Sequence, residues 1–330
     1  MINLCVFGAG RIGSIHTDNV ARNPKVAIRY VVDAYAPAAE KLASKYDARV
    51  VSVEEALADP EVHGVIIASS TDTHADLIEA SAKAGKAIFC EKPVDLSADR
   101  VRACLKTVEE TGVICNIGFN RRCDPQFRAI KEAIQGGKVG QLEMLSITSR
   151  DPSPPPVEYI KVSGGLFRDM MIHDLDMARF LLGEEPVEVY ATASCLVDPA
   201  IGEAGDVDSA LVTLKTASGK LCQISNSRRA AYGYDQRVEA HGSKGMAQIG
   251  NDLESNLVLS TDNGVSGAKP QHFFLERYEK AYRIELENFI DCIQGTAEPI
   301  ANTFDGLQSI LLADAAAESV ATGKPVRLAN

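Results

Sequence analysis

Between Gly164 and Gly183 the chain reads GGLFRDMMIHDLDMARFLLG, an apolar segment that carries an acid, Asp169, and a histidine, His173, four residues apart. At about 100° per residue, one narrow face of a helix would hold four of its side chains: Asp169, His173, Asp176 and Phe180. A polar stripe on an otherwise apolar helix indicates a lined cleft. Two structural interpretations stay open here, because Asp169 could cap a helix and His173 could be a hydrogen-bonded core histidine.

An imidazole one helical turn after a carboxylate is suited to acid–base chemistry. The pKa of an unperturbed histidine is about 6.5, close to the pH at which enzymes work. The carboxylate can orient the ring and stabilise the imidazolium.

A glycine-rich segment near the start of the chain is typical of a dinucleotide site. FGAGRIG follows the apolar run INLCVFG, opens a helical pattern, and has the spacing G-x-G-x-x-G, with five residues of interest in the turn: Gly8, Gly10, Arg11, Ile12 and Gly13. The glycines permit a tight turn and close approach of a pyrophosphate to the helix N-terminus.

An acid at the end of the second predicted strand completes the dinucleotide pattern. Asp33 lies twenty residues after Gly13 and can accept hydrogen bonds from the adenosine ribose hydroxyls. A 2′-phosphate beside this carboxylate would be repelled, and Ala34 and Tyr35 offer no arginine to offset the repulsion. We therefore predict NAD rather than NADP.

Loops after the other strands of such a sheet line the same crevice. SSTDTH offers Ser70, Thr71 and His74, and CEKPV offers Glu91 and Lys92. A lysine before a proline is commonly a surface charge. Beside a nicotinamide, Lys92 becomes a candidate to hold a substrate hydroxyl.

The pattern of elements predicts two domains. Residues 1–119 alternate continuous apolar strands with helices, which indicates an α/β Rossmann domain, a doubly wound parallel sheet that binds NAD. Residues 120–330 read as an α+β domain for substrate binding and oligomerisation, with an open, mostly antiparallel sheet within Val187–Leu259. The helices near its C-terminus could pack back on the first domain.

Composition excludes several classes of protein. The 330 residues carry a net charge of −11, which disfavours nucleic acid or an anionic membrane as a partner. Eight cysteines without C-x-x-C pairs and six scattered histidines predict reduced thiols and no metal site. With no signal peptide pattern and no apolar run of about 18 residues, we expect a cytoplasmic protein.

Five segments, in order, resemble the inositol dehydrogenase and glucose–fructose oxidoreductase family (Gfo/Idh/MocA): GAGRIG, SSTDTHADL, EKPV, GFNRR and GGLFRDMMIHDLD. The resemblance spans the chain, and YGYDQR and FFLERYEKAYRIELENFIDCI are similar to the branch that oxidises inositol. It implies a Rossmann domain joined to an open-sheet domain, and a homotetramer assembled through that sheet.

The resemblance also implies roles for individual residues. Lys92 matches the EKP lysine, and Asp169 and His173 match the D-x-x-x-H pair, the three catalytic residues of inositol dehydrogenases. Three further positions contact the polyol in relatives, Arg121 of NRR, Asp151 of SRDP and Tyr234 of YGYD, with an asparagine in some relatives where this chain has Asp151.

The expected activity is NAD-dependent oxidation of a cyclitol secondary alcohol, myo-inositol to 2-keto-myo-inositol (scyllo-inosose), with release of NADH. Three alternatives remain open: a dehydrogenase of another sugar or polyol in the family, a glycosidase that retains its NAD, and an NAD-binding regulator without catalysis. Retention of Lys92, Asp169 and His173 together disfavours the regulator.

Overall fold

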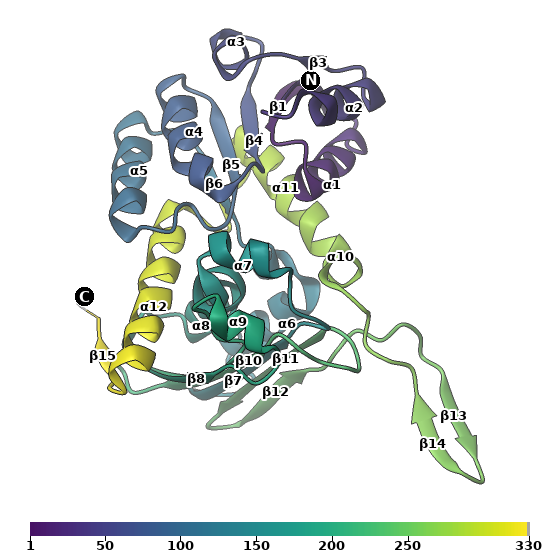
Figure 1. Ribbon diagram of the computed structural model, residues 1–330, viewed down its shortest axis with the longest axis vertical. Coiled ribbons are helices and arrows are strands. Elements are labelled where there is room, and N and C mark those ends of the chain that lie inside the picture. Colours follow the sequence, from purple (N-terminus) through teal and green to yellow (C-terminus); the bar gives the residue numbers. More distant parts are fainter. Residues whose placement is uncertain (329–330) are drawn as a thin grey trace. The chain divides into compact units, whose positions relative to one another are not determined.

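The computed structural model describes residues 1–328, so the last two residues of the predicted second domain, 329–330, lie outside the described part. The chain forms two compact units. The first combines residues 1–123 with 281–310, and the second begins at Asp124, runs to Lys280 and resumes at Leu311. Figure 1 labels the elements of both units.

The first unit is built on a six-stranded parallel sheet with the strand order β3-β2-β1-β4-β5-β6. Its strands are β1 (Ile2–Phe7), β2 (Val26–Val32), β3 (Arg49–Val50), β4 (Gly64–Ile67), β5 (Ala87–Glu91) and β6 (Cys115–Gly118). This order reverses between β1 and β4, and ligands of doubly wound sheets bind at the carboxyl ends of the strands at such a point. The predicted Rossmann domain is confirmed.

Five helices connect these strands: α1 (Arg11–Ala21), α2 (Ala36–Lys45), α3 (Val53–Ala58), α4 (Thr71–Lys83) and α5 (Ala98–Thr111). Local sequence explains their ends. Ser52 and Glu55 form a reciprocal capping box at the start of α3. Ser97 caps α5, which ends at Gly112 in the left-handed conformation. The short β3 and α3 are absent from the sequence-based prediction because their apolar pattern is too brief.

The core of the first unit draws on both ends of the chain. Strand residues such as Leu4, Ile66 and Phe89 are fully buried, as expected for a parallel sheet covered on both faces. They cluster with Leu286 and Phe289 of α11 (Glu279–Ile293). A helix from the far end of the chain therefore completes the packing of the six-stranded sheet.

The second unit contains a seven-stranded sheet with the order β12-β11-β7-β10-β9-β8-β15. Its strands are β7 (Leu142–Arg150), β8 (Pro186–Ser194), β9 (Ser209–Thr216), β10 (Leu221–Ser227), β11 (Asp235–Gly242), β12 (Gly245–Ile249) and β15 (Val326–Arg327). All neighbours are antiparallel except β7 and β10, which confirms the mostly antiparallel sheet. Burial alternates along β9, so one face is covered and the other exposed.

Helices and a hairpin complete the second unit. The helices are α6 (Pro125–Gln135), α7 (Val157–Ser163), the π-helical segment η2 (Phe167–Met171), α8 (Ile172–Leu182), α9 (Pro199–Glu203) and α10 (Phe274–Arg277). The hairpin pairs β13 (Val258–Thr261) with β14 (Gly264–Gly267). A last helix, α12 (Thr303–Thr322), begins in the first unit and ends in the second. Within residues 1–328, no helix is long and apolar enough to cross a membrane.

The segment Gly164–Gly183 is not one regular α-helix, contrary to the prediction. Gly164 and Gly165 have φ values of 85° and 78° and separate α7 from the next helical turn. That turn is π-helical, over Phe167–Met171, and only after it does α8 begin. A π turn holds more residues than an α turn, so a periodicity of 3.6 does not describe which side chains share a face across it.

Candidate active site

The glycine loop after β1 has the shape that a bound pyrophosphate needs. Gly8 has a φ of 103°, and a Cβ there would lie 2.5 Å from the backbone of Ala68 and Ser69. A Cβ on Gly13 would lie 1.9 Å from the Gly8 carbonyl oxygen, whereas one on Gly10 would meet nothing within 4 Å. Gly8 and Gly13 therefore allow the backbone of the turn to pack closely. Gly10 leaves open space at the N-terminus of α1.

Asp33, at the end of β2, is held beside this loop by its backbone contacts. Its Oδ2 accepts a hydrogen bond from the Ala9 N–H at 2.6 Å, and its Oδ1 accepts one from the Tyr35 N–H at 2.8 Å. A carboxylate has about four lone-pair sites, so two contacts leave room for ribose hydroxyls. Arg11 is exposed and Ile12 half-buried at the start of α1.

The loops after β4 and β5 are tied together by His74. Its buried ring has Nδ1 2.8 Å from the Pro93 carbonyl oxygen and Nε2 3.1 Å from the Ser69 carbonyl oxygen. Ser70 and Thr71 stand at the N-terminus of α4. Both ring nitrogens of His74 are thus directed at protein carbonyls, and the side chain holds the two loops together.

Glu91 and Lys92 stand at the end of β5. The Glu91 Oε1 lies 2.7 Å from Nε2 of His16, a fully buried residue of α1. Lys92 is half-buried, and the Lys92–Pro93 peptide bond is cis. Arg121 belongs to the short 3-10 helix η1 (Asn120–Cys123), directly after β6, and is 4% exposed. Glu91 and Lys92 thus lie at the carboxyl end of β5, and Arg121 lies just beyond the carboxyl end of β6.

In the second unit, Asp169 is the third residue of the π-helical segment and not a helix cap. Its Oδ1 accepts a hydrogen bond of 2.9 Å from the Tyr159 hydroxyl. Its Oδ2 lies 3.4 and 3.5 Å from the two terminal nitrogens of Arg228, whose side chain is 1% exposed. Burial and the neighbouring Asp169 raise the pKa of Tyr159, so its hydroxyl stays a donor to the carboxylate.

His173 is half-buried in the first turn of α8, while the acids after it are buried. Asp174 is fully buried and accepts a hydrogen bond of 3.0 Å from the Asn226 amide. Asp176 is 1% exposed and pairs with Arg179 at 3.3 Å. The Asp176 end of the predicted polar stripe is therefore occupied by an ion pair inside the unit.

Asp151 and Tyr234 occupy the ends of neighbouring strands. Asp151 follows β7, and its N–H donates to the Ser227 carbonyl oxygen at 3.0 Å. Tyr234 precedes β11, is 6% exposed, and packs edge-on against Tyr278 with ring centroids 5.9 Å apart. The pairing of Asp235 with Arg150 aligns the two strands, so both candidate substrate residues lie at the same edge of the sheet.

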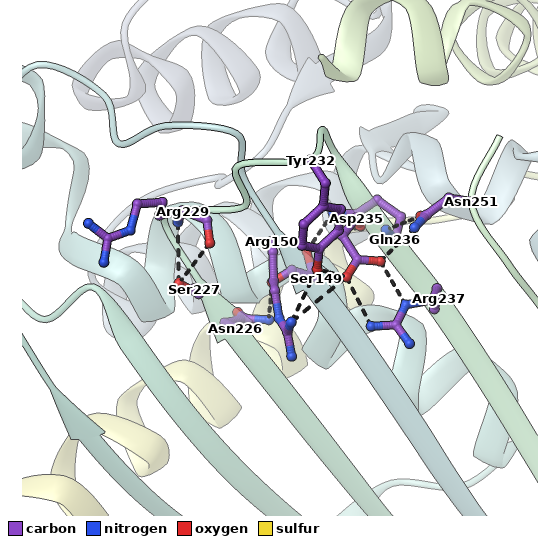
Figure 2. A network of polar contacts seen from close by, with 10 residues as sticks. All are labelled: Ser149, Arg150, Asn226, Ser227, Arg229, Tyr232, Asp235, Gln236, Arg237 and Asn251. Atoms are coloured by element: carbon purple, nitrogen blue, oxygen red, sulfur yellow. Dashed lines mark hydrogen bonds and ion pairs between the residues drawn. The ribbon is translucent and has the colours of Figure 1, made fainter. Parts of the chain in front are cut away.

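A polar network fixes this edge, as Figure 2 shows. Its centre is the fully buried Asp235, which accepts hydrogen bonds from Tyr232 at 2.6 Å, from Arg237 at 2.7 and 2.9 Å, and from Asn251 at 2.7 Å. Burial alone would raise the pKa of Asp235, but these donors lower it below its usual range. Arg150 also donates to Tyr232 at 3.2 Å. Asp235 and its hydrogen-bond donors therefore hold the turn that carries Tyr234.

Sequence reasoning missed the residues that support the candidates. Arg228, Tyr159 and His16 are separated from the side chains they contact by 59, 10 and 75 positions. Arg228 sits in NSRRA, where two adjacent arginines after a strand indicate nothing more than surface charge.

Of the predicted residues, the first unit brings those of the glycine loop together with Asp33. The second holds Asp169 with His173 and Asp151 with Tyr234.

Two family models match the chain. One, described as an oxidoreductase family with an NAD-binding Rossmann fold, matches residues 2–119. The other, described as the GFO/IDH/MocA C-terminal domain, matches residues 127–248. The chain belongs to the Gfo/Idh/MocA family of NAD-binding oxidoreductases.

Among curated relatives, inositol 2-dehydrogenase of Rhizobium meliloti (strain 1021) is 53% identical, over 98% of each chain. A solved myo-inositol dehydrogenase of Corynebacterium glutamicum ATCC 13032 superposes with a TM-score of 0.96 at 41% identity, covering 100% of this chain and 99% of the other. Scyllo-inositol dehydrogenase of Lactobacillus casei, solved with NAD(H) and scyllo-inositol, gives a TM-score of 0.92 at 26% identity and 99% coverage of both.

Proposed function

We propose that this protein oxidises a secondary alcohol of a cyclitol with NAD, converting myo-inositol to 2-keto-myo-inositol (scyllo-inosose) and releasing NADH. The observation that carries the proposal is the fixed carboxylate of Asp169 one turn before the half-buried His173, in a chain 53% identical over nearly its full length to an inositol 2-dehydrogenase.

The residues of the first unit fit NAD. Gly10 leaves open space at the start of α1, and Asp33 is fixed where it can accept ribose hydroxyls. Other candidate contacts are Gly8, Arg11, Ile12, Gly13, Ser70, Thr71, His74, Glu91 and Lys92. When bound, NAD would accept the hydride that leaves the carbon of the alcohol.

The proton of the alcohol requires a base from the protein, and His173 has this role in the proposal. An imidazole is neutral at working pH and takes up a proton readily. Asp169 orients the ring and stabilises the imidazolium that forms. Lys92 holds the reacting oxygen and stabilises the negative charge that develops on it.

The remaining hydroxyls of a cyclitol need polar partners. Arg121, Asp151 and Tyr234 are proposed to supply them, and a wrong epimer would leave one of these groups unpaired. Asp151 is a carboxylate at a position where some relatives have an amide, so it accepts hydrogen bonds but cannot donate them. This difference favours, as the second candidate, another polyol of the same chemical class.

We further propose a cytoplasmic homotetramer. Each of the eight cysteines is a free thiol, which fits a reducing compartment. On the exposed face of the second unit's sheet, Leu221 pairs with Met144, Met144 with His241, and His241 with Met246. Leu221, Met144 and Met246 are 41, 47 and 49% exposed, and this row of three apolar residues and one histidine is suited to contact with a second copy.

A panel of polyols with NAD tests the activity, with NADH followed by its absorbance. We expect myo-inositol to give the highest kcat/KM among myo-, scyllo- and chiro-inositol and glucose. Preference for a pyranose would replace the proposal by the second candidate. Turnover of glycosides without net NADH would indicate the glycosidase, and absence of turnover with tight NADH binding would indicate the regulator.

A further inference from the structure

We propose that Arg228 is a positioning residue of the active site, whose buried guanidinium sets both the orientation and the effective charge of Asp169. The inference rests on the proposed function, because it assigns Asp169 to catalysis. Arg228 is 1% exposed, so it cannot bind substrate itself and acts through the carboxylate it faces.

The geometry places Arg228 between two acids, Asp169 within the π-helical segment and Asp206, which binds the residue before that segment. Its terminal nitrogens lie 3.4 and 3.5 Å from Oδ2 of Asp169, and one lies 3.7 Å from Oδ2 of Asp206. Asp206 in turn accepts the Leu166 N–H at 3.0 and 3.1 Å, directly before the segment begins. One side chain thus links the start of the irregular turn to the functional carboxylate within it.

The other oxygen of Asp169 is held independently, which leaves the carboxylate few alternative orientations. Tyr159 of α7 donates to Oδ1 at 2.9 Å. The backbone of Arg228 is also anchored, since its N–H donates to the Asp208 carbonyl oxygen at 2.8 Å. Asp208 is itself fully buried and accepts the N–H groups of Leu196 and Val197 at 2.8 Å each.

Charge gives Arg228 a role beyond packing. In a site screened from water, a guanidinium beside a carboxylate offsets much of its field. Asp169 therefore stabilises the imidazolium of His173 less than an unpaired carboxylate would. Loss of the positive charge would raise the pKa of the base.

The test is Arg228→Gln in the full-length enzyme, with the polyol that the wild type oxidises best. We expect kcat to fall roughly 10- to 100-fold, a loss common when a group that orients a functional side chain is removed. The acid limb of the kcat–pH profile should move to higher pH by about half a unit or more. The NADH dissociation constant, from fluorescence titration, should stay within about twofold.

Arg228→Lys retains the charge but not the planar fork. We expect its acid limb to match the wild type while kcat recovers only in part. If Arg228→Gln does not fold, the test is a lowered kcat in Arg228→Lys at a wild-type melting temperature, and a wild-type kcat there overturns the inference. Arg229→Gln is the matched control, because Arg229 is exposed and its guanidinium donates only to the Val197 carbonyl oxygen, at 3.4 Å, in the part of the chain described.

Wild-type kcat and an unmoved acid limb in both Arg228 variants would overturn the inference. So would a loss of activity in Arg228→Gln that accompanies a lowered melting temperature with no change in the acid limb, because that outcome marks a structural residue. An inactive wild type across the polyol panel overturns the proposed function instead, and is recognised before any variant is made.

Discussion

The Ala9 N–H donates a hydrogen bond of 2.6 Å to Oδ2 of Asp33, which ties the glycine loop after β1 to the acid at the end of β2. The same carboxylate also accepts the Tyr35 N–H at 2.8 Å. Asp33 is therefore both a candidate ribose ligand and a brace for the loop that would receive the pyrophosphate. Its replacement should change cofactor choice and cofactor affinity together.

Asp33→Ser should narrow the preference for NAD over NADP, because the repulsion between the carboxylate and a 2′-phosphate is removed. We expect kcat/KM with NADP to rise about tenfold, equivalent to about 1.4 kcal/mol, while kcat/KM with NAD falls because Ala9 loses its acceptor. Steady-state kinetics of both cofactors with one polyol measure this. Equal use of NAD and NADP by the wild type would contradict the assignment of Asp33.

His173→Ala should lower kcat by about 10²- to 10⁴-fold, the usual contribution of a general base. Asp169→Asn should also be severe, because the charge that stabilises the imidazolium is lost. The measurement is kcat across pH 6–10, with an NADH titration and a thermal melt on the same variants. Near wild-type kcat in His173→Ala, or loss of activity explained by failed folding or NADH binding, would remove the support for this role.

Glu285→Gln should stabilise the protein at neutral and alkaline pH. Burial, and then the nearby Glu91, raise the pKa of Glu285 well above its usual range. Between the ordinary value and the raised one, the folded state binds a proton that the unfolded state has released, so stability falls as pH rises through this window. The amide removes that loss. We expect a melting temperature about 2–4 °C higher at pH 8 and little difference near pH 4.

The control for this prediction is Glu287→Gln on the same helix. Glu287 is 54% exposed and pairs with Arg283 at 3.7 Å, a surface contact that contributes little. Its melting temperature should stay close to that of the wild type at both pH values. A Glu285→Gln protein that melts lower than the wild type at pH 8 would show that the carboxylate is used in the folded state.

The double variant Met144→Glu and Leu221→Glu should dissociate the proposed tetramer. The two side chains are paired across β7 and β10 on the exposed face, so two acids there repel each other and their copies in a second subunit. Light scattering at micromolar concentration should fall from a multiple of 35.4 kDa toward a single chain. Leu196→Glu, at a site 71% exposed outside the sheet, should leave the mass unchanged. A wild type of 35.4 kDa would contradict the assembly.

The first unit could be predicted well because its signals are local. Glycines at Gly8 and Gly13 meet backbone atoms that a side chain could not approach, and the fully buried strands of a parallel sheet require continuous apolar runs. Asp33 was identified from its distance along the chain to the same loop. Each of these constraints acts within a few tens of residues, so a local sequence pattern is enough to predict it.

The surroundings of the candidate acid and histidine depended on the tertiary structure. The spacing of Asp169 and His173 is visible in the sequence. The left-handed glycines Gly164 and Gly165 and the π-helical segment after them, which set the relative orientation of these two side chains, are not. Arg228 meets Asp169 across 59 positions, and Leu286 joins the strands of the first unit from the far end of the chain. Such contacts depend on which elements pack together. Packing depends on the shape and burial of the whole unit, which no local pattern of residues records.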